Sequence, residues 1–336
     1  MESHEHAWQE IVEGKRAVPV TLTIVEVRGR DAGKVLNNLC TAAVAQLADG
    51  TGCEAFITDV RGKTLGHGFI HAIGERFLIC GAPGQAAAIC AHVDRYTIRE
   101  DAVATDTGEA MFGWLLSGCA PIPAWSAFCP WTTSGRGTEQ ELRNAVLCED
   151  PCNLACEVRI TSPSDLLVIA PRERIEEVRR WASDHGLALP DCSAATASEN
   201  KVLEAIRILQ GFPWWGHDFD ATALPQELNR DALAISFTKG CYLGQETVAR
   251  LDALGQVQKR LCGFQSPSGV DLLAGKELAQ LDGKIVGKVT SLAPTPSGSV
   301  GLGMIRRGNW EPGTQLRCGD AMITVCPLPI PLPRIA

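Results

Sequence analysis

The sequence predicts an α+β protein that ends in a small β-barrel. Over most of the chain, segments with the alternating apolar pattern of strands are interleaved with segments of helical spacing. From about Gln258 the composition changes, and repeated glycine and proline separate short strand-like segments, as in small barrels. The chain has 336 residues, 45% of them hydrophobic, which is enough for two or three domains with a real core. We therefore expect one region at 1–257 and a barrel domain at 258–336.

The N-terminal elements follow from local patterns in the order of the chain. Residues 20–30 alternate like a strand, and residues 31–47 carry apolar side chains at helical spacing. Residues 54–81 predict three short strands, and residues 84–96 predict a helix. This strand–helix–strand–strand–strand–helix order is typical of α+β folds in which helices cover one face of a sheet.

The middle of the chain predicts more strands and then two long helices. Residues 113–165 are strand-like and rich in turn residues, whereas residues 173–186 form a charged amphipathic pattern that stops at a glycine. Residues 198–211 are helical in pattern and also end at a glycine, Gly211, before Pro213.

Composition and charge exclude several classes of function. The net charge is −8 and no long basic run is present, which argues against a protein that binds duplex DNA. No apolar run approaches the ~20 residues of a membrane span, and the polar N-terminus lacks the pattern of a signal peptide. We therefore expect a cytoplasmic protein whose fourteen cysteines are mostly reduced thiols.

Three cysteines recur at every fourth position in the middle of the chain: Cys148, Cys152 and Cys156. On a helix they would share one face and resemble a ligand set for a metal or cluster. Pro151 interrupts a helix here, and on a strand the same spacing also places side chains on one face. Three buried strand thiols are the simpler interpretation.

The stretch 206–227 combines aromatic and acidic side chains in a loop after a long helix. The residues of interest are Trp214, Trp215, Asp218, Gln226 and Glu227. Aromatic rings beside acids suit a flat heterocycle with a donor edge, and tryptophans that anchor a packed loop are the alternative. The chain has no P-loop, dinucleotide fingerprint, HExxH or GxSxG motif.

The stretch TKGCYLGQETVAR at 238–250 places Lys239 two residues before Cys241. In an extended segment such residues lie on one side, so the ammonium would favour the thiolate of Cys241. Gly240 and Gly244 permit the backbone to approach a ligand closely. A buried cysteine in a glycine turn is the alternative.

This stretch resembles the K-G-C-Y-x-G-Q-E signature of YgfZ-type folate-binding proteins in the aminomethyltransferase (glycine cleavage T-protein) superfamily. The matching residues are Lys239, Gly240, Cys241, Tyr242, Gly244, Gln245, Glu246 and Arg250. The resemblance covers nearly the whole chain and implies a three-domain ring, with two interleaved α+β subdomains before the barrel and a funnel that holds tetrahydrofolate. It also implies a role in assembly or repair of iron–sulfur enzymes, including radical enzymes that modify tRNA. Cys241 would then hold a cluster iron transiently or exchange with a partner thiol.

Two positions depart from the folate-dependent aminomethyltransferases of this superfamily. Their acid pair corresponds to Gly66 and His67 here, and a helix-end glutamate that faces the pterin corresponds to Leu209. A leucine cannot accept hydrogen bonds from a pterin edge, and transfer chemistry requires charged groups near the amine. We expect an accessory protein that binds folate and meets iron–sulfur client enzymes or assembly factors, with aminomethyltransferase activity of the glycine cleavage type as the alternative.

A third hypothesis is an RNA-binding module. Its surface would be a local basic patch formed by Arg250, Lys259, Arg260, Arg306 and Arg307. The negative net charge disfavours this hypothesis.

Overall fold

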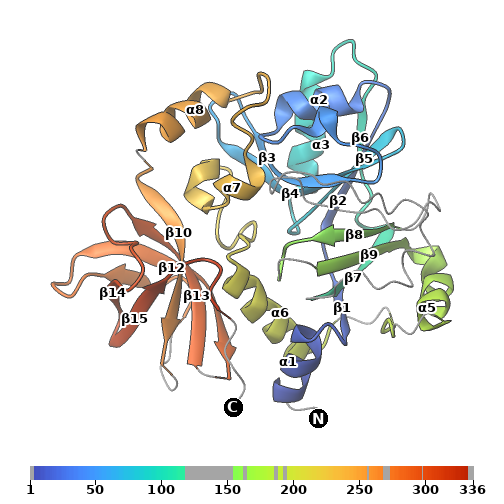
Figure 1. Cartoon of the computed structure of the whole chain (residues 1–336). Helices are drawn as coiled ribbons and strands as arrows, with labels where there is room; N and C mark the ends of the chain where they lie inside the picture. The colour runs from blue at the N-terminus through green and yellow to red at the C-terminus, as the bar shows by residue number, and fades with distance from the viewer. Residues whose placement is uncertain are drawn as a thin grey trace.

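Three sheet-built units lie around two central helices, α6 (Ala197–Gln210) and α7 (Asp231–Ala234), in a computed structural model of the chain (Figure 1). The predicted α+β class, the ring of three units and the C-terminal barrel are confirmed. The structure describes residues 4–117, 154–161, 165–184, 188–191, 195–255, 257–267, 273–296 and 298–331.

The first unit is a five-stranded antiparallel sheet in the order β3-β4-β5-β2-β6. Its strands are β2 (Thr23–Arg28), β3 (Gly52–Thr58), β4 (Thr64–Ile73), β5 (Arg76–Gly81) and β6 (Val103–Asp106). Helices α2 (Ala32–Leu39) and α3 (Ala86–Tyr96) cover one face, where their buried Val35, Leu36 and Ile89 join the sheet core. The three strands and the helix predicted over 54–96 are confirmed.

The helix predicted over 31–47 is shorter in the structure and ends at Leu39. Cys40 is extended and forms a bridge with Ile57, and a short 3₁₀ turn follows at Val44–Gln46. The Oγ1 atom of the buried Thr41 accepts from the N–H of Phe56 at 2.9 Å and donates to the carbonyl of Ala234 at 2.5 Å. These contacts draw the chain into the sheet edge, and helical spacing alone could not reveal them.

The second unit is a four-stranded antiparallel sheet in the order β1-β7-β9-β8. Its strands are β1 (Ala17–Val20), β7 (Met111–Leu116), β8 (Leu154–Val158) and β9 (Asp165–Pro171). The strand predicted over 20–30 is confirmed as β2 of the first sheet, whereas β1, which ends at Val20, was not predicted. One face packs against the first sheet around Phe69, Leu167 and Phe212, and the other is covered by α5 (Ile175–Asp184).

The third unit is a closed six-stranded antiparallel barrel. Its strands are β10 (Lys259–Ser266), β11 (Glu277–Ala279), β12 (Ile285–Thr295), β13 (Gly298–Arg306), β14 (Gln315–Cys318) and β15 (Ala321–Cys326). Phe264 fills the barrel interior, and a Cβ atom at Gly301 would lie 2.2 Å from its ring. A glycine is therefore required where the ring crosses β13.

Helix α6 (Ala197–Gln210) connects the three units. It begins with a capping box between Thr196 and Glu199 and ends at Gly211, whose φ is +67°. One face packs against α1 (His4–Val12) and the barrel, and the first turns of the opposite face remain available to a cavity. Within the described ranges, none of the helices is long and apolar enough to cross a membrane.

Candidate functional site

The signature forms an exposed loop, residues 236–244, between α7 (Asp231–Ala234) and α8 (Gln245–Leu254). We call this segment the Cys241 loop. Among the eight cysteines whose side chains the structure describes, Cys241 alone is exposed. Burial raises the pKa of the Cys53 thiol above its usual range, and it raises the pKa of the Cys80 thiol to about 12. In the described part of the chain, Cys241 is therefore the thiol most accessible to a partner.

Lys239 holds this loop from beneath. Its ammonium donates to the carbonyls of Asn37, Cys40 and Ala42 at 2.7, 2.8 and 2.6 Å. It also lies 5.1 Å from the centre of the Tyr242 ring, and burial lowers the pKa of Lys239. An ammonium has three N–H donors, and all three are engaged by these carbonyls.

The structure directs the Lys239 ammonium to three backbone carbonyls, whereas the sequence-based expectation directed it to the thiol of Cys241. Lys239 is 9% exposed and points into the fold, whereas Gly240 and Cys241 face solvent. The expectation assumed an extended segment, in which alternate residues share a side. The loop is instead an irregular turn, because the lysine reaches inward to the end of α2.

The loop is fixed at its other end by the glycine that precedes α8. Gly244 has a φ of +82°, and a Cβ atom there would lie 2.4 Å from the carbonyl oxygen of Asp59 and 2.6 Å from the backbone of Gly62. The adjoining backbone of Leu243 bonds to Asn38 at 2.8 Å. The turn between β3 and β4 therefore packs directly against the start of α8.

The remaining signature residues surround this helix start. Tyr242 is buried against Phe56 and Val248, and its N–H donates to the side-chain oxygen of Gln245 at 3.3 Å. Glu246 and Arg250 are exposed on α8. The structure thus brings the signature together as one surface feature with a buried anchor.

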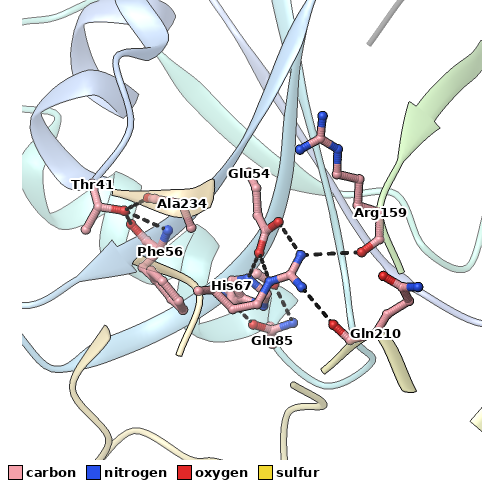
Figure 2. Close-up of polar contacts among 9 residues, drawn as sticks. Thr41, Glu54, Phe56, His67, Gln85, Arg159, Gln210 and Ala234 are labelled. Atoms are coloured by element: carbon pink, nitrogen blue, oxygen red, sulfur yellow. Dashed lines mark hydrogen bonds and ion pairs between the residues drawn. The ribbon is translucent and has the colours of Figure 1, made fainter. Parts of the chain in front are cut away.

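A buried cluster of charged groups lies behind this feature, and sequence reasoning missed it. Glu54 on β3 accepts from Arg230 Nε at 2.7 Å and from Arg230 Nη2 at 2.5 Å, and its Oε1 lies 2.7 Å from His67 Nε2 (Figure 2). The guanidinium also reaches the carbonyls of Arg159 and Gln210 at 3.4 Å. Arg230 therefore joins the first sheet, the end of α6 and the segment after β8.

The environment of this Glu54–Arg230–His67 cluster fixes its charges. Burial alone would raise the pKa of Glu54, but the charge of Arg230 and the hydrogen bonds from His67 and Arg230 lower it to about 2. Burial lowers the pKa of His67 against the opposing influence of Glu54. His67 stacks on Phe56 with ring centres 4.6 Å apart. The only sequence signal was a glutamate within an otherwise apolar strand.

His67 of this cluster and Leu209 stand at positions where the resemblance to aminomethyltransferases led us to expect acids. His67 is 3% exposed, and Leu209 is fully buried in the core between α6, α1 and the barrel. Neither position offers a free carboxylate to a ligand.

A cavity of about 390 Å³ lies on the side of α6 opposite the face that packs against α1 and the barrel. We call it the α6 cavity; its wall is formed by Pro19, Val20, Thr21, Leu22, Pro83, Phe112, Leu115, Ile160, Thr161, Ala195, Asn200, Leu203, Glu204, Arg207 and Trp214. Its volume lies within the range of small-molecule sites, and its wall is mainly apolar with a few polar groups.

Of the five residues predicted to contact folate, Trp214 alone lines this cavity. Trp215 packs edge-on against Phe219, with ring centres 5.3 Å apart. Asp218 is buried and accepts from Arg207 at 2.8 Å. The other four residues of the predicted set therefore do not line the α6 cavity.

Gln226 and Glu227 also have partners within the fold. Gln226 Nε2 donates to the carbonyl of Val248 at 2.7 Å. Glu227 accepts from the N–H of Leu224 at 3.0 Å and lies 3.6 Å from Lys259 Nζ.

The described residues contain no group of three His, Cys, Asp or Glu side chains placed to hold a metal ion. Cys148 and Cys152 lie outside the described residues, as does the side chain of Cys156. Of the predicted basic patch, Lys259 faces Arg306 across β10 and β13, and Arg260 stacks on Trp310.

Comparison with known proteins identifies relatives that match most of the chain. No protein-family model matches the chain. The chain is 25% identical to the tRNA-modifying protein YgfZ of Escherichia coli over 94% of both chains. It is 22% identical to the mitochondrial iron–sulfur cluster assembly factor IBA57 of Mus musculus, over 92% of this chain and 82% of that protein. It spans 66% of the length of a chloroplastic protein of Arabidopsis thaliana, with which it is 24% identical.

The fold has a solved counterpart. The aminomethyltransferase T of the glycine cleavage system from Bartonella henselae superposes with a TM-score of 0.75 and 16% identity, over 96% of this chain and 89% of that chain. The fold is thus the one that the signature implied. The chain is thus similar over most of its length to YgfZ and IBA57 proteins, and it has the fold of the glycine cleavage T protein.

Proposed function

We propose that this protein binds tetrahydrofolate and supports assembly or repair of iron–sulfur clusters in client enzymes. The observation that carries the proposal is the exposed Cys241 thiol on a loop that Lys239 anchors. The names of the relatives, an iron–sulfur cluster assembly factor and a tRNA-modifying protein, support the choice of client. The clients include radical enzymes that modify tRNA.

In this proposal Cys241 acts as a thiolate ligand to iron or as a thiol that meets a partner thiol. A thiolate is a soft ligand that suits iron in clusters. Lys239 is a positioning residue, because its three donors hold the turn after α2 and leave none for the sulfur. Glu246 and Arg250 lie on the exposed helix that follows and belong to the same partner surface.

Folate binding is proposed from the family resemblance and the T-protein fold. The alternative, aminomethyl transfer, would need acids where the chain has Gly66, His67 and Leu209. Since His67 is committed to Glu54 and Leu209 is buried, the site lacks the groups that manage charge and protons in that reaction.

The test is complementation of cells that lack the protein. Wild type, Cys241→Ala and Cys241→Ser are compared by the activity of iron–sulfur enzymes, with Cys326→Ala on β15 as the matched control. Wild type and the control should restore activity, and both Cys241 variants should fail at equal protein levels. An exposed thiol contributes little packing, so failure of the Cys241 variants would reflect the lost thiol and not misfolding. Full restoration by Cys241→Ala would contradict the proposal.

A further inference from the structure

The α6 cavity presents one charged acceptor to a ligand, the carboxylate of Glu204. Glu204 lines the cavity wall, and 33% of its side chain is exposed. The other charged group in the wall, Arg207, is 3% exposed. The charged group that the cavity offers to a ligand is therefore the partly exposed carboxylate of Glu204.

Arg207 fixes this carboxylate and has no donor to spare. Its Nε donates to Glu204 Oε2 at 2.9 Å, and its Nη2 donates to the other oxygen of Glu204 and to Ser291. Its Nη1 donates to the carbonyl of Phe212 at 2.6 Å and to Asp218 at 2.8 Å. All five N–H groups of the guanidinium are engaged.

Two consequences follow for the ligand. The arginine cannot bind an anion in the cavity, because it has no free donor. Each oxygen of the Glu204 carboxylate retains one lone pair after accepting from the arginine. A carboxylate held rigidly by a two-point contact is a preorganised acceptor for N–H donors.

The remaining wall suits a flat ring. Trp214 lines the cavity together with apolar residues such as Leu22, Leu115 and Leu203. The Arg207 guanidinium lies 5.6 Å from the centre of the Trp214 ring. Aromatic and aliphatic walls with one convergent acceptor favour a nitrogen-rich heterocycle over an aliphatic or acidic ligand.

We infer that the α6 cavity binds the aminopyrimidine-containing ring of a reduced folate, with Glu204 as the acceptor for its N–H donors and Trp214 as the aromatic wall. This inference rests on the proposed folate binding and names its site and its recognition residue. The acid that accepts hydrogen bonds from the ring is then at position 204 and not at position 209, because Leu209 is buried in the core. The acidic tail of folate remains outside the cavity, since Arg207 is unable to receive it.

Calorimetric titration of the full chain with 5-formyltetrahydrofolate tests the inference. Glu204→Gln is compared with Glu176→Gln, which removes the carboxylate of an exposed i,i+3 pair with Arg179 on α5. Loss of a charge-assisted hydrogen bond should weaken binding about 10- to 100-fold in Glu204→Gln, and binding to the control should remain as in wild type. p-Aminobenzoylglutamate, which lacks the ring, should show no difference between wild type and Glu204→Gln.

A second variant covers the case in which Glu204→Gln does not fold. Ala195→Phe adds a ring to the cavity wall without removing a polar group, and it should abolish binding of the reduced folate. Wild-type affinity in either folded variant would overturn the inference and leave folate binding itself intact. If the wild-type chain shows no binding at millimolar ligand, folate binding fails and this inference falls with it.

Discussion

Arg230→Met tests whether the buried Glu54–Arg230–His67 cluster holds the units of the ring together. The substitution keeps much of the side-chain volume but removes the cation that faces the fully buried Glu54. It also removes the contacts of Arg230 with the carbonyls of Arg159 and Gln210. A buried charge that loses its partner typically costs about 3–5 kcal/mol.

The pKa of Glu54 gives a second estimate of this magnitude. The folded-state pKa is about 2, against an ordinary pKa of 4.5 for a glutamate. At about 1.4 kcal/mol for each pKa unit, the charged form is stabilised by about 3 kcal/mol relative to the unfolded chain. Because the folded pKa is depressed, this stability is present above pH 4.5 and is lost as the pH falls from 4.5 to 2. The two estimates agree in size.

The assay is urea unfolding of wild type and Arg230→Met at pH 7 and at steps between pH 4.5 and 2.5. At pH 7 the variant should lose about 3 kcal/mol, and the difference from wild type should shrink as the pH falls. Replacing both partners, Glu54→Leu with Arg230→Met, should cost less than Arg230→Met alone. Arg179→Met, which removes an exposed pair with Glu176, is the control and should cost less than about 1 kcal/mol. A loss below about 1 kcal/mol for Arg230→Met, or a difference independent of pH, would refute the reasoning.

Three further outcomes are expected. Burial lowers the pKa of His71 to about 4, and neither ring nitrogen has a hydrogen-bond partner in the described structure, so the chain should lose stability as the pH falls from 6.5 towards 4. His71→Leu should remove that loss, as measured by thermal unfolding across this range, and an unchanged pH profile would contradict it. Gly244→Ala should destabilise the chain by more than about 2 kcal/mol, because it adds a clash with Asp59 to the strain of a positive φ. The control is Gly255→Ala, at φ +55° with nothing within 4 Å, which should show the strain alone, about 1 kcal/mol. Ammonia release from an aminomethylated carrier should stay at background with this chain, because Leu209 replaces the expected acid, and robust turnover would reverse that conclusion.

Local patterns in the sequence predicted most of the elements because their causes are local. The strands and the helix over 54–96 follow from alternation and turn glycines, and the end of α6 follows from Gly211. The predicted helix over 31–47 failed because Thr41 bonds to Phe56 and to Ala234, which is 193 residues away in sequence. Such a contact has no local signature.

In the candidate site, too, the features with a local cause were predicted and those that depend on contacts distant in sequence were not. The signature identified the exposed cysteine, but the direction of Lys239 depends on carbonyls about 200 residues earlier in the chain. The acceptor Glu204 was missed because a glutamate three residues before an arginine on a helix is usually a surface pair. Only the tertiary structure shows that Arg207 is buried and turns this pair towards a cavity.

Lys239→Met separates the two roles that this lysine could have. In the structure the ammonium holds the carbonyls of Asn37, Cys40 and Ala42, so its loss should free the turn after α2. One unsatisfied buried group costs about 1–3 kcal/mol, and we expect a loss of at least about 2 kcal/mol. Cys40, which is now fully buried beneath the loop, should become accessible to iodoacetamide.

The labelling of Cys241 decides between the two roles. Since Cys241 is already exposed and makes no contact with the ammonium donors, its rate should change less than about twofold when Lys239 is lost. The measurement is residue-by-residue mass spectrometry of native wild type and Lys239→Met, with Lys284→Met, at an exposed turn, as the control. A strong decrease at Cys241 without new labelling at Cys40 would show that the lysine acts on the thiol directly. The expected pattern, new labelling at Cys40 with Cys241 unchanged, would show that the lysine presents the thiol by fixing the loop.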